Sequence, residues 1–81
     1  MFIGGKVLSF EDDGKYIKME MEQTDGHYAS VFINKNEYDL CKNYIEKYII
    51  IEGKHIEEND VNNGSIRIGT LVNRILNVDE M

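Results

Sequence analysis

Strictly alternating side chains at residues 15–23 constrain the fold of this chain more strongly than any other feature. Ile17, Met19 and Met21 occupy one set of alternate positions, and the other set, at positions 16, 18, 20 and 22, carries tyrosine, lysine and glutamate. Because successive side chains of a β-strand point to opposite faces, the pattern predicts a strand with one buried face and one face in water.

An Asp-Gly pair bounds this strand on each side, at Asp13-Gly14 and at Asp25-Gly26. Asp-Gly is frequent in tight hairpin turns because both residues tolerate the left-handed backbone conformation that such turns need. Residues 5–10 and 27–33, which lie beyond the two turns, also have the apolar pattern of strands. The first three strands are therefore predicted to form an antiparallel meander joined by two hairpins.

The periodicity changes at Asn34, where a helix is predicted to run to about Lys47. Asn34 and Asn36 are both suited to cap it, and Glu37 stands three positions after Asn34, as in a capping box. A helix of about 12 residues is marginal alone, so its apolar stripe is expected to dock on the open end of a barrel, with its cysteine as a buried, inert thiol. The stripe at helical spacing consists of Leu40, Cys41, Tyr44, Ile45 and, at its edge, Tyr48.

The second half of the chain returns to β character. A β-branched run predicts a fourth strand at residues 48–57, in which Gly53 is expected to mark a bulge or a sharp bend. Residues 58–64 are predicted to be a polar loop. Residues 65–78 form the last segment, where Gly69 suggests a second bulge and the pattern after it fits either a strand or a helical turn.

The predicted order of elements is three strands, a helix and two strands within 81 residues. For one domain covering residues 1–81, that order predicts a mostly β fold: a five-stranded OB-type Greek-key barrel with one short helix between the third and fourth strands. A domain this small buries a modest share of its surface. Self-association into a homo-oligomer is therefore expected, because it would add buried area.

Composition and motifs bound the location and the chemistry. The longest apolar run is residues 49–51, whereas a membrane helix needs about 20 residues, and no secretory signal is recognised. A cytoplasmic protein without membrane association is expected. The sequence has neither a catalytic Ser/His/Asp order nor metal-ligand spacing nor a glycine-rich phosphate loop. No enzymatic activity, cofactor or metal site is therefore expected.

Two short segments resemble bacterial single-strand DNA-binding proteins and the related primosomal replication protein. They are Gly5-Lys6-Val7 and the sequence YIIIEGK at residues 48–54, since those proteins also place a short helix before a strand of an apolar run, Glu, Gly and a basic residue. The resemblance implies single-stranded DNA bound across the second and third strands, in replication or in mobile-element maintenance. Carried over by position, the nucleic-acid-binding residues are Tyr16, Lys18, Tyr28, Ser30, Phe32, Lys54 and Arg67.

The net charge of −6 supports an alternative function. Lys and Arg contacts to phosphate dominate nucleic-acid affinity, whereas the loops after the first and fourth strands are acidic, and Glu20 and Glu22 share the implied binding face. The alternative is an acidic protein–protein interaction or self-assembly module that binds no nucleic acid. In that case the aromatic side chains of this face pack against one another or under a partner. Basic side chains that converge beside the aromatic ones favour the first hypothesis, and scattered ones favour the second.

Overall fold

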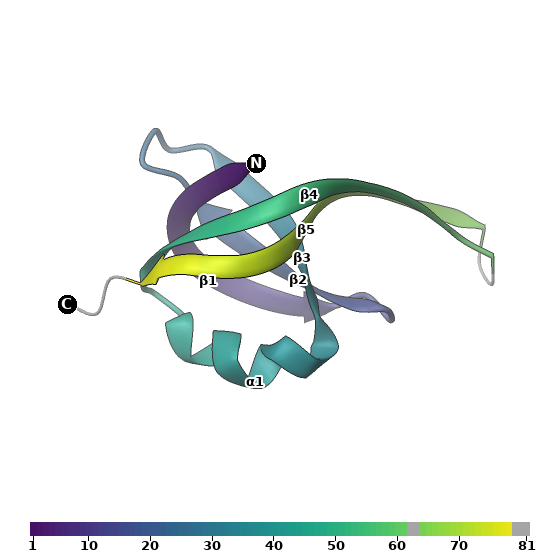
Figure 1. The fold of residues 1–81 in the computed structure, drawn as a ribbon, viewed down its shortest axis with the longest axis horizontal. Coiled ribbons are helices and arrows are strands. Elements are labelled where there is room, and N and C mark those ends of the chain that lie inside the picture. Colours follow the sequence, from purple (N-terminus) through teal and green to yellow (C-terminus); the bar gives the residue numbers. More distant parts are fainter. Residues whose placement is uncertain (62–63, 79–81) are drawn as a thin grey trace.

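The computed structural model describes residues 1–61 and 64–78, and five strands make up most of them (Figure 1). The barrel closes in the order β1-β2-β3-β5-β4, with all pairs antiparallel except β3 with β5. The predicted five-stranded barrel, with a short helix between the third and fourth strands, is confirmed. The strands are β1 (Phe2–Asp12), β2 (Tyr16–Glu22), β3 (Tyr28–Asn34), β4 (Tyr48–Asp60) and β5 (Ser65–Val78).

The core lies inside this barrel and uses the inward faces of all five strands. The alternation predicted for β2 is confirmed at Met19 and Met21, which are inaccessible, and at Lys18, which precedes Met19 and is exposed. Full burial of an apolar side chain of this size contributes about 1.5–3 kcal/mol. The buried cluster consists of Val7, Ile17, Met19, Met21, Val31, Ile33, Cys41, Ile49, Ile51 and Val72.

Strand β1 is longer than the predicted residues 5–10 because it has two neighbours. Its first half pairs with β4, from Phe2 opposite Glu52, and its second half pairs with β2, up to Asp12. The strand changes partner at Lys6, and its register with β2 shifts just after this point, between Val7 and Ser9. Such a bulge bends a strand, as a closed barrel requires.

The predicted polar loop at residues 58–64 is wrong in its first part, because β4 continues through Asp60, which pairs with Ser65. Asn62 and Asn63 lie outside the described residues. Strand β5 then runs to Val78, so the strand alternative for the last segment is the correct one. We call residues 56–60 and 65–69 the arm, since this part of the β4–β5 hairpin lies beyond the pair of Thr70 with Val31 of β3 and extends well beyond the barrel in Figure 1.

The two glycines expected to mark bulges behave differently. The register of the β4–β5 pair shifts between Glu52 and Gly53, as predicted. Gly69 instead pairs regularly with Ile56, so the prediction of a bulge there is wrong. A Cβ atom at Gly69 would lie 2.8 Å from the ring of Phe32. Glycine at this position therefore allows the ring to pack directly against the backbone of β5.

The helical segment lies across one end of the barrel, as expected (Figure 1), but the predicted continuous helix to Lys47 is wrong. Within residues 34–47, only α1 (Tyr38–Cys41) is α-helical, with 3-10 turns at Lys35–Glu37 and Lys42–Tyr44. Asn34 has an extended backbone and makes no side-chain capping bond, so the capping box does not form. In the described residues no helix is long and apolar enough to cross a membrane.

The apolar stripe of this segment is narrower than predicted. Cys41 is buried and Tyr44 packs against the core, whereas Leu40 and Ile45 are exposed. The 3-10 turns advance side chains by a different angle from that of an α-helix, so the stripe does not stay on one face. Burial, together with the nearby Glu37, raises the pKa of the Cys41 thiol to about 11, which agrees with the inert thiol expected.

Candidate nucleic-acid interface

One row of side chains crosses four strands on the outside of the barrel. Lys18 on β2 pairs with Phe32 on β3, which pairs with Leu71 on β5. Leu71 in turn pairs with Lys54 on β4. Directly paired residues project from the same face of a sheet, and both lysines are exposed while the two apolar side chains are half-buried. We call these four residues the lysine-capped row, because an apolar centre has an ammonium group at each end.

Tyr28 and Ser30 extend this face along β3, as predicted, because they alternate with Phe32 and are exposed. Tyr28 is the most accessible of the three aromatic residues predicted for this face (Tyr16, Tyr28 and Phe32), with 62% of its surface exposed. Their neighbours on β2 are acidic, since Glu20 pairs with Ser30 and Glu22 with Tyr28. The face therefore combines an aromatic and cationic region with an acidic border.

Most of the basic side chains are already paired with carboxylates. The basic side chains in ion pairs are Lys6, Lys15, Lys35, Lys42, Arg67 and Arg74. Within residues 1–61 and 64–78, the basic side chains without an ion-pair partner are Lys18, Lys47 and Lys54. Two of these three are the ends of the lysine-capped row.

Tyr16 is predicted to lie on the exposed face, but the structure buries it, with 6% of its surface exposed. Its ring packs against Phe32 with 5.7 Å between the ring centroids. Its hydroxyl donates a hydrogen bond to Glu58 Oε2 at 2.8 Å. Burial, together with this hydrogen bond, raises the pKa of Tyr16. The alternation places Tyr16 correctly on the outer side of β2, but the arm covers that side, so the ring packs against Phe32 instead of facing solvent.

Arg67 is also withdrawn from the surface, because only 10% of its side chain is exposed. Its Nε donates to Asp13 Oδ2 at 2.8 Å, and its guanidinium lies 3.9 Å from Asp60 and 5.5 Å from the centre of the Tyr16 ring. The hydrogen bond to Asp13 raises the pKa of Arg67 further above its ordinary value. The guanidinium of Arg67, which was predicted to contact a phosphate, is thus already paired with carboxylates.

These contacts belong to one network, which we call the turn–arm cluster: Asp13 and Lys15 from the β1–β2 turn and Tyr16 from the start of β2, with Glu58 and Arg67 from the arm. Lys15 Nζ donates to Glu58 Oε1 at 2.7 Å. Hydrogen bonds from Lys15 and Tyr16 lower the pKa of Glu58. Burial by itself would raise the pKa of Asp13, but hydrogen bonds from the Tyr16 N–H and from Arg67 outweigh it and lower that pKa.

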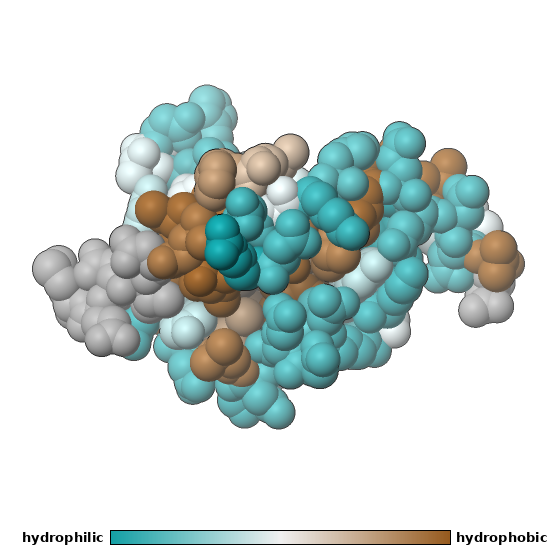
Figure 2. All heavy atoms as spheres, in the orientation of Figure 1, coloured by the Kyte–Doolittle hydropathy of each residue, from teal (hydrophilic) through white to brown (hydrophobic). Residues whose placement is uncertain are grey.

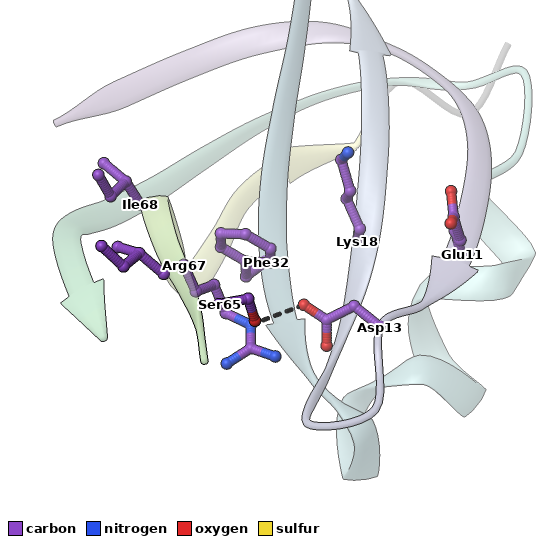
Figure 3. Close-up of a pocket in the computed structure, with 8 residues that line it drawn as sticks. Glu11, Asp13, Lys18, Phe32, Ser65, Arg67 and Ile68 are labelled. Carbon is purple, nitrogen blue, oxygen red and sulfur yellow. Dashed lines mark hydrogen bonds and ion pairs between the residues drawn. The ribbon is translucent and has the colours of Figure 1, made fainter. Parts of the chain in front are cut away.

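A groove of about 310 Å³ lies between the row and the arm (Figure 3). Lys18 and Phe32 line it from the β2–β3 side, and Ile66 and Ile68 line it from the arm. Both isoleucines are more than half exposed. The groove can hold a flat apolar group beside the Phe32 ring, with the Lys18 ammonium group at its rim. It is completed by Glu11, Asp13, Ser65 and Arg67.

Sequence reasoning missed three residues of this site. Ile66 and Ile68 alternate with Arg67 in the sequence but were not assigned to the binding face, and their part of β5 lies in the arm. Leu71 follows Gly69, where the pattern did not distinguish strand from helical turn. The alternation of residues 66–68 was the available signal, because it indicates a strand. What the two isoleucines face depended on the length of the hairpin, which the alternation does not give.

The fold defines the class to which the chain can be compared, the OB barrels. No protein-family model matches the chain, and no curated protein matches it. Among solved structures, it is similar to the crystal structure of the mitochondrial single-stranded DNA-binding protein Rim1 from S. cerevisiae, with a TM-score of 0.58. The match covers 96% of this chain and 91% of that chain at 16% sequence identity. The expected resemblance in fold to single-strand DNA-binding proteins is therefore confirmed.

Proposed function

We propose that this chain is a non-enzymatic OB-fold module that binds single-stranded nucleic acid across the outer face of β2, β3 and β5. The lysine-capped row carries the proposal. Phe32 offers an aromatic surface on which a base can stack, a contact that contributes about 1–3 kcal/mol per base. Lys18 and Lys54 supply charges that no carboxylate in the described residues neutralises.

The spacing of the row suits a single strand. Lys18 and Lys54 are separated by three strand intervals, which is about 14 Å at the usual spacing of neighbouring strands. The two ammonium groups would therefore contact different phosphates of one bound strand. Tyr28 lies further along β3 on the same face and offers a second stacking position.

Charge makes the proposed binding weak and salt-sensitive. Glu20 and Glu22 border the face, and the whole chain has a net charge of −6. With two phosphate contacts, the logarithm of the affinity should fall with the logarithm of salt concentration at a slope of about −1.4. We therefore expect binding near micromolar concentration at low salt and little binding at physiological salt.

The test is fluorescence anisotropy of a labelled oligothymidine of about 30 nucleotides, long enough to span an OB barrel. The double variant Lys18→Ala/Lys54→Ala should weaken binding by about tenfold or more, because both phosphate contacts are lost. Lys47→Ala is the matched control, since Lys47 also lacks an ion-pair partner in residues 1–61 and 64–78 but does not belong to the row. Absence of binding by the unmodified protein at low salt would contradict the proposal.

We place this activity in the cytoplasm, in replication or in the maintenance of a mobile element. The support for this setting is the resemblance of residues 48–54 to single-strand DNA-binding and primosomal proteins. We further propose that the module acts as a homo-oligomer, because Phe2 and Leu76 are exposed apolar side chains of the barrel and Figure 2 shows brown, apolar surface on the barrel. Sedimentation velocity tests the oligomeric state, and a monomer at all concentrations would contradict it.

A second candidate is an acidic protein-interaction module without nucleic-acid affinity. It is favoured by the acidic side chains that make no ion pair within the part of the chain that the structure describes. A basic protein would be the matching partner. Recovery of a complex with a basic partner, combined with no oligothymidine binding, would favour this candidate. The carboxylates concerned are Glu11, Glu20, Glu22, Glu37 and Glu57.

A further inference from the structure

The arm and the β1–β2 turn are joined by two reciprocal ion pairs. Asp13, in the turn, accepts a hydrogen bond from Arg67 Nε of the arm at 2.8 Å. Glu58, in the arm, accepts one from Lys15 Nζ of the turn at 2.7 Å. Each segment thus supplies one carboxylate that holds a cation of the other segment.

Both of these cations lie beside the proposed binding face. Arg67 lines the same groove as Lys18 and Phe32 (Figure 3). Lys15 Nζ lies 5.2 Å from the centre of the Tyr16 ring, which packs against Phe32. Four cations therefore surround this face, and carboxylates neutralise two of them.

The Asp13–Arg67 pair is well shielded from water. The side chains are 22% and 10% exposed, respectively, and salt screens such partly buried pairs less than it screens exposed ones. Asp13 is also fixed by its own turn, because its Oδ1 accepts hydrogen bonds from the N–H groups of Lys15 and Tyr16. A nucleic-acid phosphate would have to displace a carboxylate that is already oriented toward the guanidinium.

We propose that Asp13 and Glu58 set the affinity of the binding face, because their carboxylates withhold Arg67 and Lys15 from nucleic-acid phosphates. This inference rests on the proposed function, since a bound phosphate is the ligand that the two carboxylates exclude. Removal of both charges leaves Lys15 without its carboxylate partner and leaves Arg67 with the more distant Asp60, at 3.9 Å. The number of cations on the face that a phosphate can reach would thereby rise from two to four. The module is thereby held in a weakly binding state by residues that touch no ligand.

A purely structural brace would behave in the opposite way. If the cluster served only to hold the arm in place, its loss would loosen one wall of the groove and weaken binding. If the cluster withholds cations, its loss strengthens binding and steepens the dependence on salt. The salt dependence separates the two roles because it counts phosphate contacts directly.

The variant that tests this is Asp13→Asn/Glu58→Gln. Asparagine retains the oxygen that accepts the two turn N–H groups, and glutamine retains an oxygen for the Tyr16 hydroxyl, so the hydrogen-bonding geometry is conserved while the charges are lost. Asp25→Asn/Glu57→Gln is the matched control with the same change in net charge. Asp25 makes the equivalent turn bond in the other hairpin, and Glu57 is the exposed neighbour of Glu58 on the arm.

Titration with the labelled oligothymidine over a series of salt concentrations gives the decisive slopes. We expect about −1.4 for the unmodified protein and the control, and about −2.8 for Asp13→Asn/Glu58→Gln. The single variants should each give about −2.1, which keeps the test available if the double variant does not fold. An unchanged slope, or weaker binding than the control, would overturn the inference.

A second measurement separates this inference from the proposed function. Inorganic pyrophosphate is titrated into each protein while NMR follows the Nε–H signal of Arg67. A shift in the double variant but not in the control supports the withholding of Arg67, even if no protein binds oligothymidine and the proposed function fails. The absence of a shift in the double variant would overturn the inference, even if oligothymidine binds elsewhere on the face.

Discussion

The two hairpin turns of the β1–β2–β3 meander have the same local chemistry and different surroundings. In the first, Asp13 Oδ1 accepts the N–H of the residue two positions on at 3.0 Å, and in the second Asp25 Oδ1 does the same at 2.9 Å. Gly14 and Gly26 follow with φ of 103° and 89°, values that favour glycine. Both turns therefore form for reasons contained in a few consecutive residues.

The turns differ in what the second carboxylate oxygen contacts. Asp13 Oδ2 binds Arg67, which is 54 positions away in the sequence, in a partly buried pair. Asp25 Oδ2 lies 3.0 Å from His27 Nδ1, and both of these side chains are mostly exposed. The comparison shows that an Asp-Gly pair specifies the turn, while the tertiary fold decides whether the same aspartate also joins two parts of the barrel.

The largest expected difference between the turns is in stability. Asp13→Ala removes the turn bonds and leaves Arg67 without its nearest carboxylate, so we expect a loss of about 2 kcal/mol in the free energy of unfolding. Urea denaturation measures it. Asp25→Ala, which removes an exposed turn bond and the exposed contact with His27, is the control. Equal losses in the two variants would show that the Arg67 pair adds nothing to the first turn.

Tyr28 follows the second turn directly and is the second proposed stacking position. This side of the comparison is therefore tested by nucleic-acid binding. Tyr28→Ala should weaken oligothymidine binding by about 1 kcal/mol, roughly fivefold, because a stacking surface is lost. Tyr28→Phe should retain the affinity, since the ring remains. Neither change should affect stability much, because the side chain is 62% exposed. Unchanged binding by Tyr28→Ala would remove this residue from the interface.

Lowering the pH should gradually remove the stability that Asp13 and Glu58 contribute around the first turn. The pKa values of Asp13 and Glu58 lie below their ordinary values of 3.8 and 4.5 in the folded protein. The stability they contribute is therefore present above those ordinary values and is lost as the pH falls through the folded values. Lys15, Arg67 and Tyr16 stay protonated throughout this range. In the turn–arm cluster, only the two carboxylates therefore change their protonation in this range.

The measurement for this prediction is the free energy of unfolding of the unmodified protein and of Asp13→Asn/Glu58→Gln between pH 7 and pH 2. The two curves should be separated at neutral pH and should converge below about pH 4. Curves that stay parallel to the lowest pH would show that the two carboxylates titrate alike in the folded and unfolded chains.

The smallest effect is expected for Asp25→Asn. Asparagine can keep the turn bond, and the lost partner of His27 is solvent-exposed, where such pairs contribute little. Hydrogen exchange of the arm and the thermal midpoint should both remain as in the unmodified protein. Faster exchange in the arm would indicate that the second turn is coupled to the arm after all.

Local patterns predicted much of the barrel. The alternation in β2, the two turns and the helical segment before β4 could each be read from a few neighbouring residues. Asn59 and Asp60 could not, because both are rare in strands and extend β4 only through pairing with β5. The burial of Tyr16 could not be predicted either, since it depends on the contact with Glu58 of the arm.

The candidate site shows the same division. Tyr28, Ser30 and Phe32 share one face because side chains alternate along a strand. That Lys18 and Lys54 cap one row depends on the register of four strands, which no local pattern specifies. The pairing of Arg67 with Asp13 depends on how far the arm reaches, and the length of the arm was itself mispredicted.

The divided pairing of β1 has a consequence for folding. Its second half meets β2 across a short turn, whereas its first half must wait for β4, whose Glu52 pairs with Phe2. Contacts distant in sequence form slowly because the intervening chain must first be closed into a loop. The meander should therefore assemble early and the barrel should close late. The late step is the pairing of β1 with β4, which includes the hydrogen bond that the N–H of Gly53 donates to the carbonyl of Met1.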